Sequence, residues 1–358
     1  MGSRSLFLAV LLALGGLGSL GCSDGGGGGA GGSSGSGGAG TGGSGGDTPL
    51  LPAPPANQGV QFNVPSVMVP PGQESQVCLY LKLPWDVEFF FDHIQMETTD
   101  GGRHLYVFKN EYFDHDEGFV PDCFTPVDTN QWAVVVQSQN QHLDWTLPDG
   151  VAFRLRRLTQ LMVIAHYYNT GSAPISGRAT INLWSRDPAT VQHWGNVVVA
   201  VQNNISIPPS QSLQVKQHCT LPVDTAETAP ANRIHPTHIL ALSGDFHRTG
   251  RDFHVVDFHL SSTVGCPPTC PGTEGTTAFY DTTDGMKPLM QIFAAGTEPV
   301  IANQDGFSFT CNYQNDSSST VVFGPRVLTQ EHCTLFTYFY PAPMDGMTLG
   351  CTEITGAW

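Results

Sequence analysis

The hydrophobic and polar residues of this chain alternate in short runs that have the length of β-strands. Ten such runs are rich in β-branched and aromatic residues: 76–83, 104–108, 132–136, 160–167, 179–184, 196–202, 238–242, 253–260, 321–323 and 334–340. Turn signals separate them, among them Pro148-Asp149-Gly150, Asn169-Thr170-Gly171 and Thr283-Asp284-Gly285. No stretch longer than two turns keeps a helical period. The pattern predicts an all-β fold of antiparallel β-sandwiches.

Composition agrees with many short strands joined by tight turns. Only 13% of the 358 residues are charged, whereas glycine (41) and proline (26) are abundant. A chain of this length can bury two hydrophobic cores. A proline-containing interruption at 207–210 marks the expected boundary, which predicts an N-terminal sandwich over 59–208 and a C-terminal sandwich over 209–358.

The first 21 residues have the features of an export signal. Arg4 is their only charge, residues 6–14 are apolar, and small residues precede Cys22. This cysteine resembles the attachment residue of a bacterial lipobox, although Ser19 stands where leucine is usual, and simple secretion is the alternative. Residues 22–58 are then the attachment cysteine and a disordered linker rich in glycine, serine and proline. We expect an exported protein, either a bacterial outer-membrane lipoprotein or one at the cell surface or in the periplasm.

The rest of the chain predicts contact with neither a membrane nor nucleic acid. No later segment has the ~20 continuous apolar residues of a membrane span, so a membrane is reached only through the N-terminal anchor. A formal net charge of −16 argues against nucleic acid, which binds basic surfaces. Eight cysteines remain after Cys22, and an even number in an exported chain predicts four disulfides rather than a zinc or redox motif.

Histidine carries most of the chemical information in the sequence, because neutral imidazole is the commonest transition-metal ligand. Four segments stand out: 89–110 with Arg103-His104, 147–169 with His166-Tyr167, 238–251 with Asp245-Phe246-His247, and 311–340 with Glu331-His332-Cys333. The motifs LPxGVxF…HY, HxTGR and CxYxN…ExC occur there in this order. They resemble the copper type II, ascorbate-dependent monooxygenases, the family of peptidylglycine α-hydroxylating monooxygenase and dopamine β-monooxygenase. The resemblance covers residues 60–355.

This resemblance implies two jelly-roll-like β-sandwich domains that face each other across a wet cleft. In the family, domain one holds an electron-storing copper on three histidines. In this chain His104 and His166 match two of these ligands, but Arg103 replaces the third, and a guanidinium has no lone pair to donate. His93 is the candidate stand-in, at a position that is ordinarily apolar.

Domain two of the family binds dioxygen on a copper held by two histidines and a methionine. Here Asp245 replaces the first histidine, His247 matches the second, and His332 replaces the methionine. The resemblance implies one or two copper ions, and the harder ligand set Asp245/His247/His332 equally suits Fe(II), Mn(II) or Zn(II). The same three residues are the candidate catalytic group. Surface or hydrogen-bonding roles are expected for the histidines without such support: His115, His142, His193, His218, His235, His254 and His259, with His238 at a family position that is not a ligand.

The resemblance also implies disulfides and a substrate class. It pairs Cys311 with Cys333 and Cys219 with Cys351. The remaining cysteines are then expected as Cys78–Cys123 and Cys266–Cys270, although other connectivities of these four stay open. Peptide-amidating members have arginine, asparagine and tyrosine where this chain has Ser243, Thr334 and Phe336. A small neutral or apolar substrate is therefore expected instead of a peptide carboxylate.

From these residues we expect a monomeric oxidoreductase that hydroxylates a C–H bond with dioxygen and an external reductant such as ascorbate. Two alternatives stay open. A non-catalytic metal-binding or surface interaction protein on the same scaffold is favoured by the replacements at Arg103, Asp245 and His332. A single-metal enzyme would use only the domain-two site.

Overall fold

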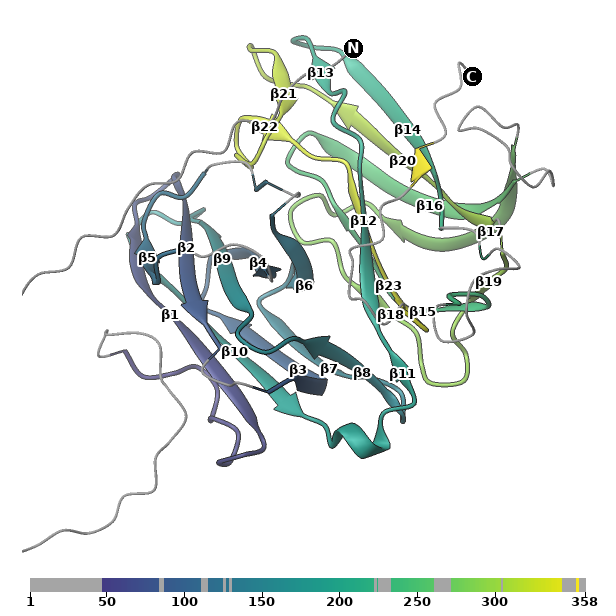
Figure 1. Cartoon of the computed structure of the whole chain (residues 1–358). Coiled ribbons are helices and arrows are strands. Elements are labelled where there is room, and N and C mark those ends of the chain that lie inside the picture. Colours follow the sequence, from purple (N-terminus) through teal and green to yellow (C-terminus); the bar gives the residue numbers. More distant parts are fainter. Residues whose placement is uncertain are drawn as a thin grey trace, which may run out of the picture. The chain divides into compact units, whose positions relative to one another are not determined.

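A computed structural model describes residues 47–83, 87–110, 115–124, 127–128, 131–221, 224, 233–260, 272–303, 305–342 and 352–353. Regular structure in these ranges is β-strand (Figure 1), apart from one 3-10 turn, η1 (Pro188–Thr190). None of these residues belongs to a helix with the length and hydrophobicity needed to cross a bilayer. The predicted all-β fold is confirmed. The export signal, Cys22 and the linker up to residue 46 lie outside the described residues.

Two sheets form the N-terminal half, defined here as residues 59–195. The six-stranded sheet has the order β1 (Gly59–Val69), β10 (Ile175–Ser185), β3 (Phe89–Thr98), β8 (Val151–Leu155) and β11 (His193–Trp194), and β7 (His142–Thr146) pairs with β3. The five-stranded sheet has the order β5 (Gly118–Val120), β2 (Glu74–Lys82), β9 (Gln160–Tyr168), β4 (Gly102–Asn110) and β6 (Ala133–Ser138). Neighbouring strands are antiparallel except β8 and β11.

Three further sheets form the C-terminal half, residues 196–353. One has the order β12 (Asn196–Val201), β23 (Thr334–Tyr340), β15 (Thr237–Asp245) and β18 (Gln291–Ile292), and β19 (Val300–Ile301) pairs with β15. A second has the order β17 (Gly272–Thr282), β16 (Gly250–Leu260), β20 (Asp305–Gln314), β14 (Ser212–Thr220) and β24 (Thr352–Glu353). The third contains β13 (Ser206–Ile207), β21 (Val321–Phe323) and β22 (Gln330–Glu331). Strands β12 and β13 thus pair in this half, and the domain boundary at 208/209 stays a prediction.

The hydrophobic interior divides into two clusters that meet at one sheet. The first core lies in the N-terminal half but also contains Phe336 and Tyr338 of β23. The second core lies in the C-terminal half and contains Leu335 and Phe339 of the same strand. Because successive side chains of a strand point to opposite faces, β23 gives its even-numbered residues to one core and its odd-numbered residues to the other. The two cores therefore share this sheet.

All ten predicted strand segments are confirmed, and they correspond to β2, β4, β6, β9, β10, β12, β15, β16, β21 and β23. Two predicted disulfides are also confirmed. Cys78–Cys123 ties β2 to the loop after β5, and Cys311–Cys333 ties β20 to the start of β23. Cys219 is disulfide-bonded as well. Its predicted partner Cys351, like Cys266 and Cys270, lies outside the described residues.

The last part of the predicted linker, residues 47–58, is held by the first sheet. The backbone N–H of Leu50 donates to Thr180 Oγ1 at 3.0 Å, and Asn182 Nδ2 donates to the carbonyl of Pro52 at 2.9 Å. Both acceptor and donor side chains belong to β10. These residues therefore pack on the sheet rather than extending freely from it.

Candidate metal centre

Three predicted ligands from distant parts of the sequence converge in the C-terminal half. Asp245, His247 and His332, called here the C-terminal group, each offer a donor atom, and these atoms lie within 4.8 Å of one another. Asp245 ends β15 and pairs with Thr334, the first residue of β23. His247 follows in the turn that leads to β16, and His332 lies between β22 and β23. Adjacent ends of two paired strands thus bring the group together.

The hydrogen bonding of His247 leaves one ring nitrogen available to a cation. Its Nδ1 lies 2.9 Å from the carbonyl oxygen of Gln330, which can only accept, so Nδ1 carries the proton. Its Nε2 is buried without a hydrogen-bond partner and lies 4.0 Å from Asp245 Oδ1. The two atoms are close enough to bind one ion, since each would lie ~2.0–2.2 Å from a transition metal. Burial, together with the charge of His332, lowers the pKa of His247 well below its usual value, so the imidazole is neutral.

Asp245 is a buried carboxylate with several donors around it. The Tyr106 hydroxyl donates to Oδ2 at 2.8 Å, and His332 Nδ1 lies 3.0 Å from the same oxygen. Burial alone would raise the pKa of this carboxyl. The hydrogen bond from His332 and the positive charges of His332 and Arg103 nevertheless hold the pKa well below its usual range. Asp245 is therefore ionised although only 1% of it is exposed.

His332 is the solvent-facing member of the group. Its side chain is 19% exposed, whereas that of His247 is fully buried. Its carbonyl accepts a hydrogen bond from the Tyr313 hydroxyl at 2.5 Å, and the disulfide of Cys333 fixes the next residue. The Phe323 ring lies 5.0 Å from the His332 ring. A molecule from solvent would reach the group along His332 and meet an apolar ring there.

Glu331 fixes the turn that carries His247. Its Oε2 accepts from the backbone N–H of His247 at 2.7 Å, and its Oε1 accepts from the N–H and hydroxyl of Thr249 at 2.6 and 2.8 Å. Burial raises the pKa of Glu331 to about 7 against these hydrogen bonds. Because Glu331 precedes His332, one side chain connects the two segments that carry the histidines.

The N-terminal half brings His104 and His166, called here the N-terminal pair, into contact. They lie opposite each other on β4 and β9, and their ring centroids are 4.7 Å apart. His166 Nε2 lies 3.2 Å from Glu74 Oε2, so this nitrogen donates and Nδ1 keeps its lone pair. The Nδ1 atoms of both histidines are buried without a partner. Burial lowers the pKa of both rings, which leaves two neutral nitrogen donors for a cation.

Arg103 points away from this pair because of a β-bulge. Gly102 pairs with Tyr167 and His104 pairs with His166, so Arg103 is the extra residue between them. A bulge bends the strand and re-aims the side chain of the inserted residue. Both Arg103 and His104 are buried, as is every residue of β4.

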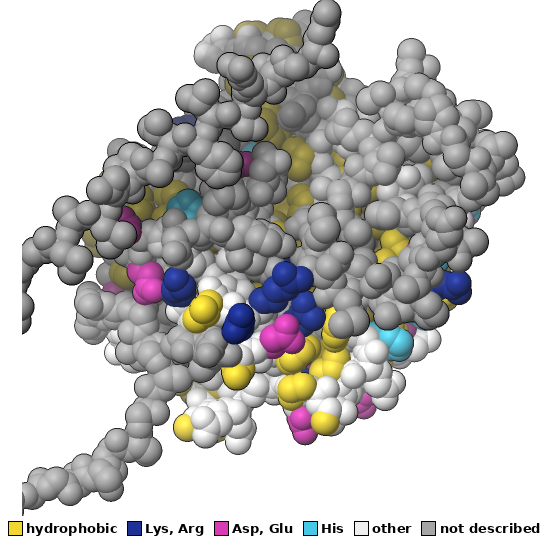
Figure 2. All heavy atoms as spheres, viewed as in Figure 1, with side chains coloured by type: hydrophobic (Ala, Val, Ile, Leu, Met, Phe, Trp, Pro, Cys, Tyr) yellow, Lys and Arg dark blue, Asp and Glu magenta, His cyan; other side chains and the backbone are white. Residues whose placement is uncertain are grey.

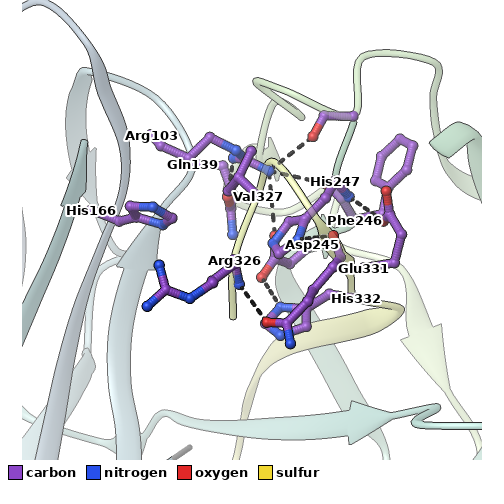
Figure 3. Close-up of polar contacts among 12 residues, drawn as sticks. Arg103, Gln139, His166, Asp245, Phe246, His247, Arg326, Val327, Glu331 and His332 are labelled. Carbon is purple, nitrogen blue, oxygen red and sulfur yellow. Dashed lines mark hydrogen bonds and ion pairs between the residues drawn. The ribbon is translucent and has the colours of Figure 1, made fainter. Parts of the chain in front are cut away.

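The Arg103 side chain crosses to the C-terminal half (Figure 3). Its Nη2 donates to the carbonyl oxygens of Phe246 and Gly285 at 2.9 and 2.8 Å and lies 3.5 Å from Asp245 Oδ1. Its Nη1 donates to Gln139 Oε1 at 2.5 Å. Here the two halves are in direct contact, where the family resemblance implies a wet cleft.

A second arginine reaches in the opposite direction. Glu74 Oε2, the partner of His166, also accepts from the backbone N–H of Val327 at 2.9 Å, and Arg326 Nη1 lies 4.0 Å from Glu74 Oε1. The Arg326 guanidinium stacks over the Phe124 ring at 4.1 Å. Figure 3 shows Arg326 and Val327 on the side of the C-terminal group that faces His166. Arg103 thus contacts the C-terminal group directly, whereas Val327 and Arg326 reach the N-terminal pair only through Glu74.

One other prediction differs from the observed contacts. His93, the candidate stand-in ligand, lies outside both groups, with its Nε2 2.7 Å from Asp144 and its ring stacked on Trp184. Sequence reasoning also missed Tyr106 and Glu74, which contact Asp245 and His166. No motif marks these two residues. Glu331 could have been found from the sequence, because it is the first residue of the ExC motif.

Comparisons with known proteins leave the family open. No protein-family model matches the chain, and neither does any curated protein. Among solved structures, the major capsid protein P2 of bacteriophage PM2 is similar at 10% identity and TM-score 0.28, covering 81% of this chain and 100% of that chain. A Sulfolobus turreted icosahedral virus structure has 9% identity and TM-score 0.20 over 77% and 59% of the two chains. The PBSX exported protein XepA has 9% identity and TM-score 0.18 over 71% and 86%. Similarities this low carry no argument about function.

Proposed function

We propose that this chain is an exported, metal-dependent oxidoreductase of the copper monooxygenase type, with Asp245, His247 and His332 as its catalytic metal ligands. It would hydroxylate a C–H bond of a small neutral or apolar substrate with dioxygen. The observation that carries the proposal is the buried, unpartnered Nε2 of His247, 4.0 Å from the ionised Asp245 and beside His332. A lone pair in that position is costly to bury unless something binds it.

A copper ion held there would supply the one-electron chemistry that activates dioxygen, and Fe(II), Mn(II) or Zn(II) are the alternatives for the same ligands. In the overall reaction one oxygen atom enters the C–H bond and the other leaves as water. The two electrons and two protons come from an external reductant such as ascorbate. The Gln330 carbonyl sets the tautomer of His247, and Tyr106 and Arg103 hold Asp245 in place.

We assign a second ion to the N-terminal pair. Its support is the two unpartnered Nδ1 atoms and the Glu74 carboxylate that orients His166. Tyr106 connects the two groups, since its ring lies 4.7 Å from the His104 ring and its hydroxyl bonds Asp245. Electrons from the reductant would enter at this pair.

Other features agree with an exported enzyme that takes a neutral substrate. Two disulfides fit an oxidising compartment, which supports export and, with Cys22, a lipid anchor. The apolar Phe323 ring beside His332 suits a substrate without charge. The formal net charge of −16 argues against a nucleic-acid partner, and Figure 2 shows an acidic side chain beside the basic ones that gather on that face. We propose a monomer.

One observation favours a second candidate, a non-catalytic metal-binding or interaction protein. Arg103, Tyr106 and His332 already surround the Asp245 carboxylate with donors, so the charge of this residue is compensated without an ion. The metal-binding form would hold an ion and the interaction protein would need none, but neither would consume dioxygen.

Metal content tests the proposal. The mature, disulfide-bonded chain from residue 23 is stripped with chelator, reloaded with copper, iron, manganese or zinc, and analysed for bound metal. We expect two ions per chain, and one fewer in His247→Ala/His332→Ala. The matched control is His142→Ala/His259→Ala, which removes two exposed histidines that also contact carboxylates and should retain both ions.

Oxygen uptake with ascorbate then separates the candidates. Uptake by the loaded protein that disappears in His247→Ala/His332→Ala supports the oxidoreductase. An enzyme that uses only the C-terminal group is supported if that variant loses a single ion and the His166→Ala protein retains its oxygen uptake. Unchanged metal content in the double variant contradicts the site assignment.

A further inference from the structure

The side chain of Arg103 brings a permanent positive charge into the C-terminal group. It is 2% exposed, and hydrogen bonds to Gln139, Phe246 and Gly285 hold its guanidinium in this buried position. A guanidinium stays protonated in proteins, so Arg103 cannot lose its charge when a cation binds nearby. A histidine in this place could do so.

This charge cancels the charge of the ligands. Asp245 contributes one negative charge, and the imidazoles of the group are neutral when they bind a metal. With Arg103 at 3.5 Å from Asp245 Oδ1, the three ligands and this guanidinium together have no net charge. Without Arg103 they would carry one negative charge. Both partners are almost fully buried, so water screens the interaction poorly.

The cost of this arrangement depends on the charge of the bound ion. Coulomb energy is proportional to that charge, so a doubly charged ion is repelled by Arg103 twice as strongly as a singly charged ion. A carboxylate with two imidazoles otherwise suits doubly charged ions. Arg103 therefore opposes the preference of its own ligand set.

We propose that Arg103 determines which charge state of copper the C-terminal group holds, favouring Cu(I) over Cu(II). The proposal rests on the proposed metal site and deepens it. Arg103 touches the ligand Asp245 rather than the ion and is thus a positioning and tuning residue. The state it favours is the one that reacts with dioxygen, so its effect would offset the absence of a soft sulfur ligand.

The test compares the affinities of Arg103→Gln and the unchanged protein for Cu(I), Cu(II) and Zn(II), by competition with chelators of known affinity. The same titrations on His247→Ala/His332→Ala give the contribution of other sites, which is subtracted. We expect Arg103→Gln to bind Cu(I) about tenfold more tightly and Cu(II) and Zn(II) about a hundredfold more tightly. The Cu(II)/Cu(I) affinity ratio then rises about tenfold, which lowers the one-electron potential by about 59 mV.

Three variants complete the design. Arg103→Lys keeps the charge and should keep the affinity ratio. Arg251→Gln removes an exposed arginine that pairs with Asp316, and it should also leave the ratio unchanged. Gln139→Glu leaves Arg103 in place but sets a carboxylate beside it, which compensates the positive charge. The affinity ratio should therefore shift in the same direction as in Arg103→Gln. This variant tests the proposal even if Arg103→Gln does not fold.

The outcomes distinguish this inference from the proposed function. If the unchanged protein binds no ion that depends on His247 and His332, the proposed site itself is wrong. If it binds one, but Arg103→Gln and Gln139→Glu change the Cu(I) and Cu(II) affinities by the same factor, the site stands and Arg103 is only structural. A rise in the ratio in both variants, with no rise in Arg103→Lys, supports the inference.

Discussion

At the scale of single residues, the C-terminal group depends on a carboxylate that is not one of its ligands. Glu331 accepts hydrogen bonds from the backbone of His247 and from the backbone and hydroxyl of Thr249. It is fully buried and adjacent to His332. The positions of both imidazoles therefore depend on the two oxygens of one side chain.

Replacing Glu331 by glutamine tests this dependence. Glutamine has one acceptor oxygen, so a backbone N–H of His247 or Thr249 would be left facing an NH₂ group. We expect a loss of about 1–3 kcal/mol in the free energy of unfolding. Metal affinity should fall by about 10–100-fold. Denaturant unfolding and chelator competition measure the two effects. The control is Glu117→Gln, at an exposed position, and equal metal affinity in both variants would contradict the role given to Glu331.

The sequence predicted which side chains come together better than it predicted what surrounds them. Asp245, His247 and His332 were found because they occupy motif positions, and they lie within 4.8 Å of one another. The direction of Arg103 was not predictable, because it follows from a bulge opposite Tyr167 and His166. A bulge is a property of two paired strands, and a single strand's residue pattern does not reveal it.

At the scale of elements, alternation found ten strands but missed others that are largely buried, such as β8 and β20, and it was insufficient to pair any of them. β23 alternates between two cores, and its predicted and observed bounds agree. β1 was missed because Pro65 interrupts it with a register shift, and β17 was missed because most of its side chains are exposed. The pairing of β12 with β23 joins residues far apart in sequence. Such pairing depends on the packing of the whole chain.

Removing each of the two described disulfides in turn should distinguish an effect on stability from an effect on the geometry of the C-terminal group. Cys311–Cys333 spans 22 residues and fixes the neighbour of His332, whereas Cys78–Cys123 spans 45 residues in the other half. Loop-closure entropy predicts a loss of about 3 kcal/mol in the free energy of unfolding for Cys311→Ser/Cys333→Ser and about 4 kcal/mol for Cys78→Ser/Cys123→Ser. Only the first pair should weaken metal binding that depends on His332. Equal affinity losses in the two variants would mean that metal binding follows overall stability.

At the scale of the whole molecule, the shared sheet joins the two halves more closely than a linker would. Tyr338 projects from β23 into the first core, packs edge-on against Trp145, and accepts a hydrogen bond from the backbone N–H of Gln137. Its neighbour Phe339 projects into the second core. All described residues belong to one compact unit. The N-terminal half would expose part of its core if the C-terminal half unfolded first.

This arrangement predicts a single unfolding transition, although a chain of this length commonly gives several. Tyr338→Ala removes a ring from the first core, and Phe339→Ala removes one from the second. Each substitution should lower the free energy of unfolding by about 3–5 kcal/mol. If the sheet couples the cores, both variants lower the midpoint temperature of one and the same transition. The calorimetric and van't Hoff enthalpies of that transition then agree. Independent domains would instead give two transitions, with each substitution lowering a different one. In that case the contacts made by Arg103 and Glu74 would be those of two hinged bodies, and the metal groups could separate without unfolding.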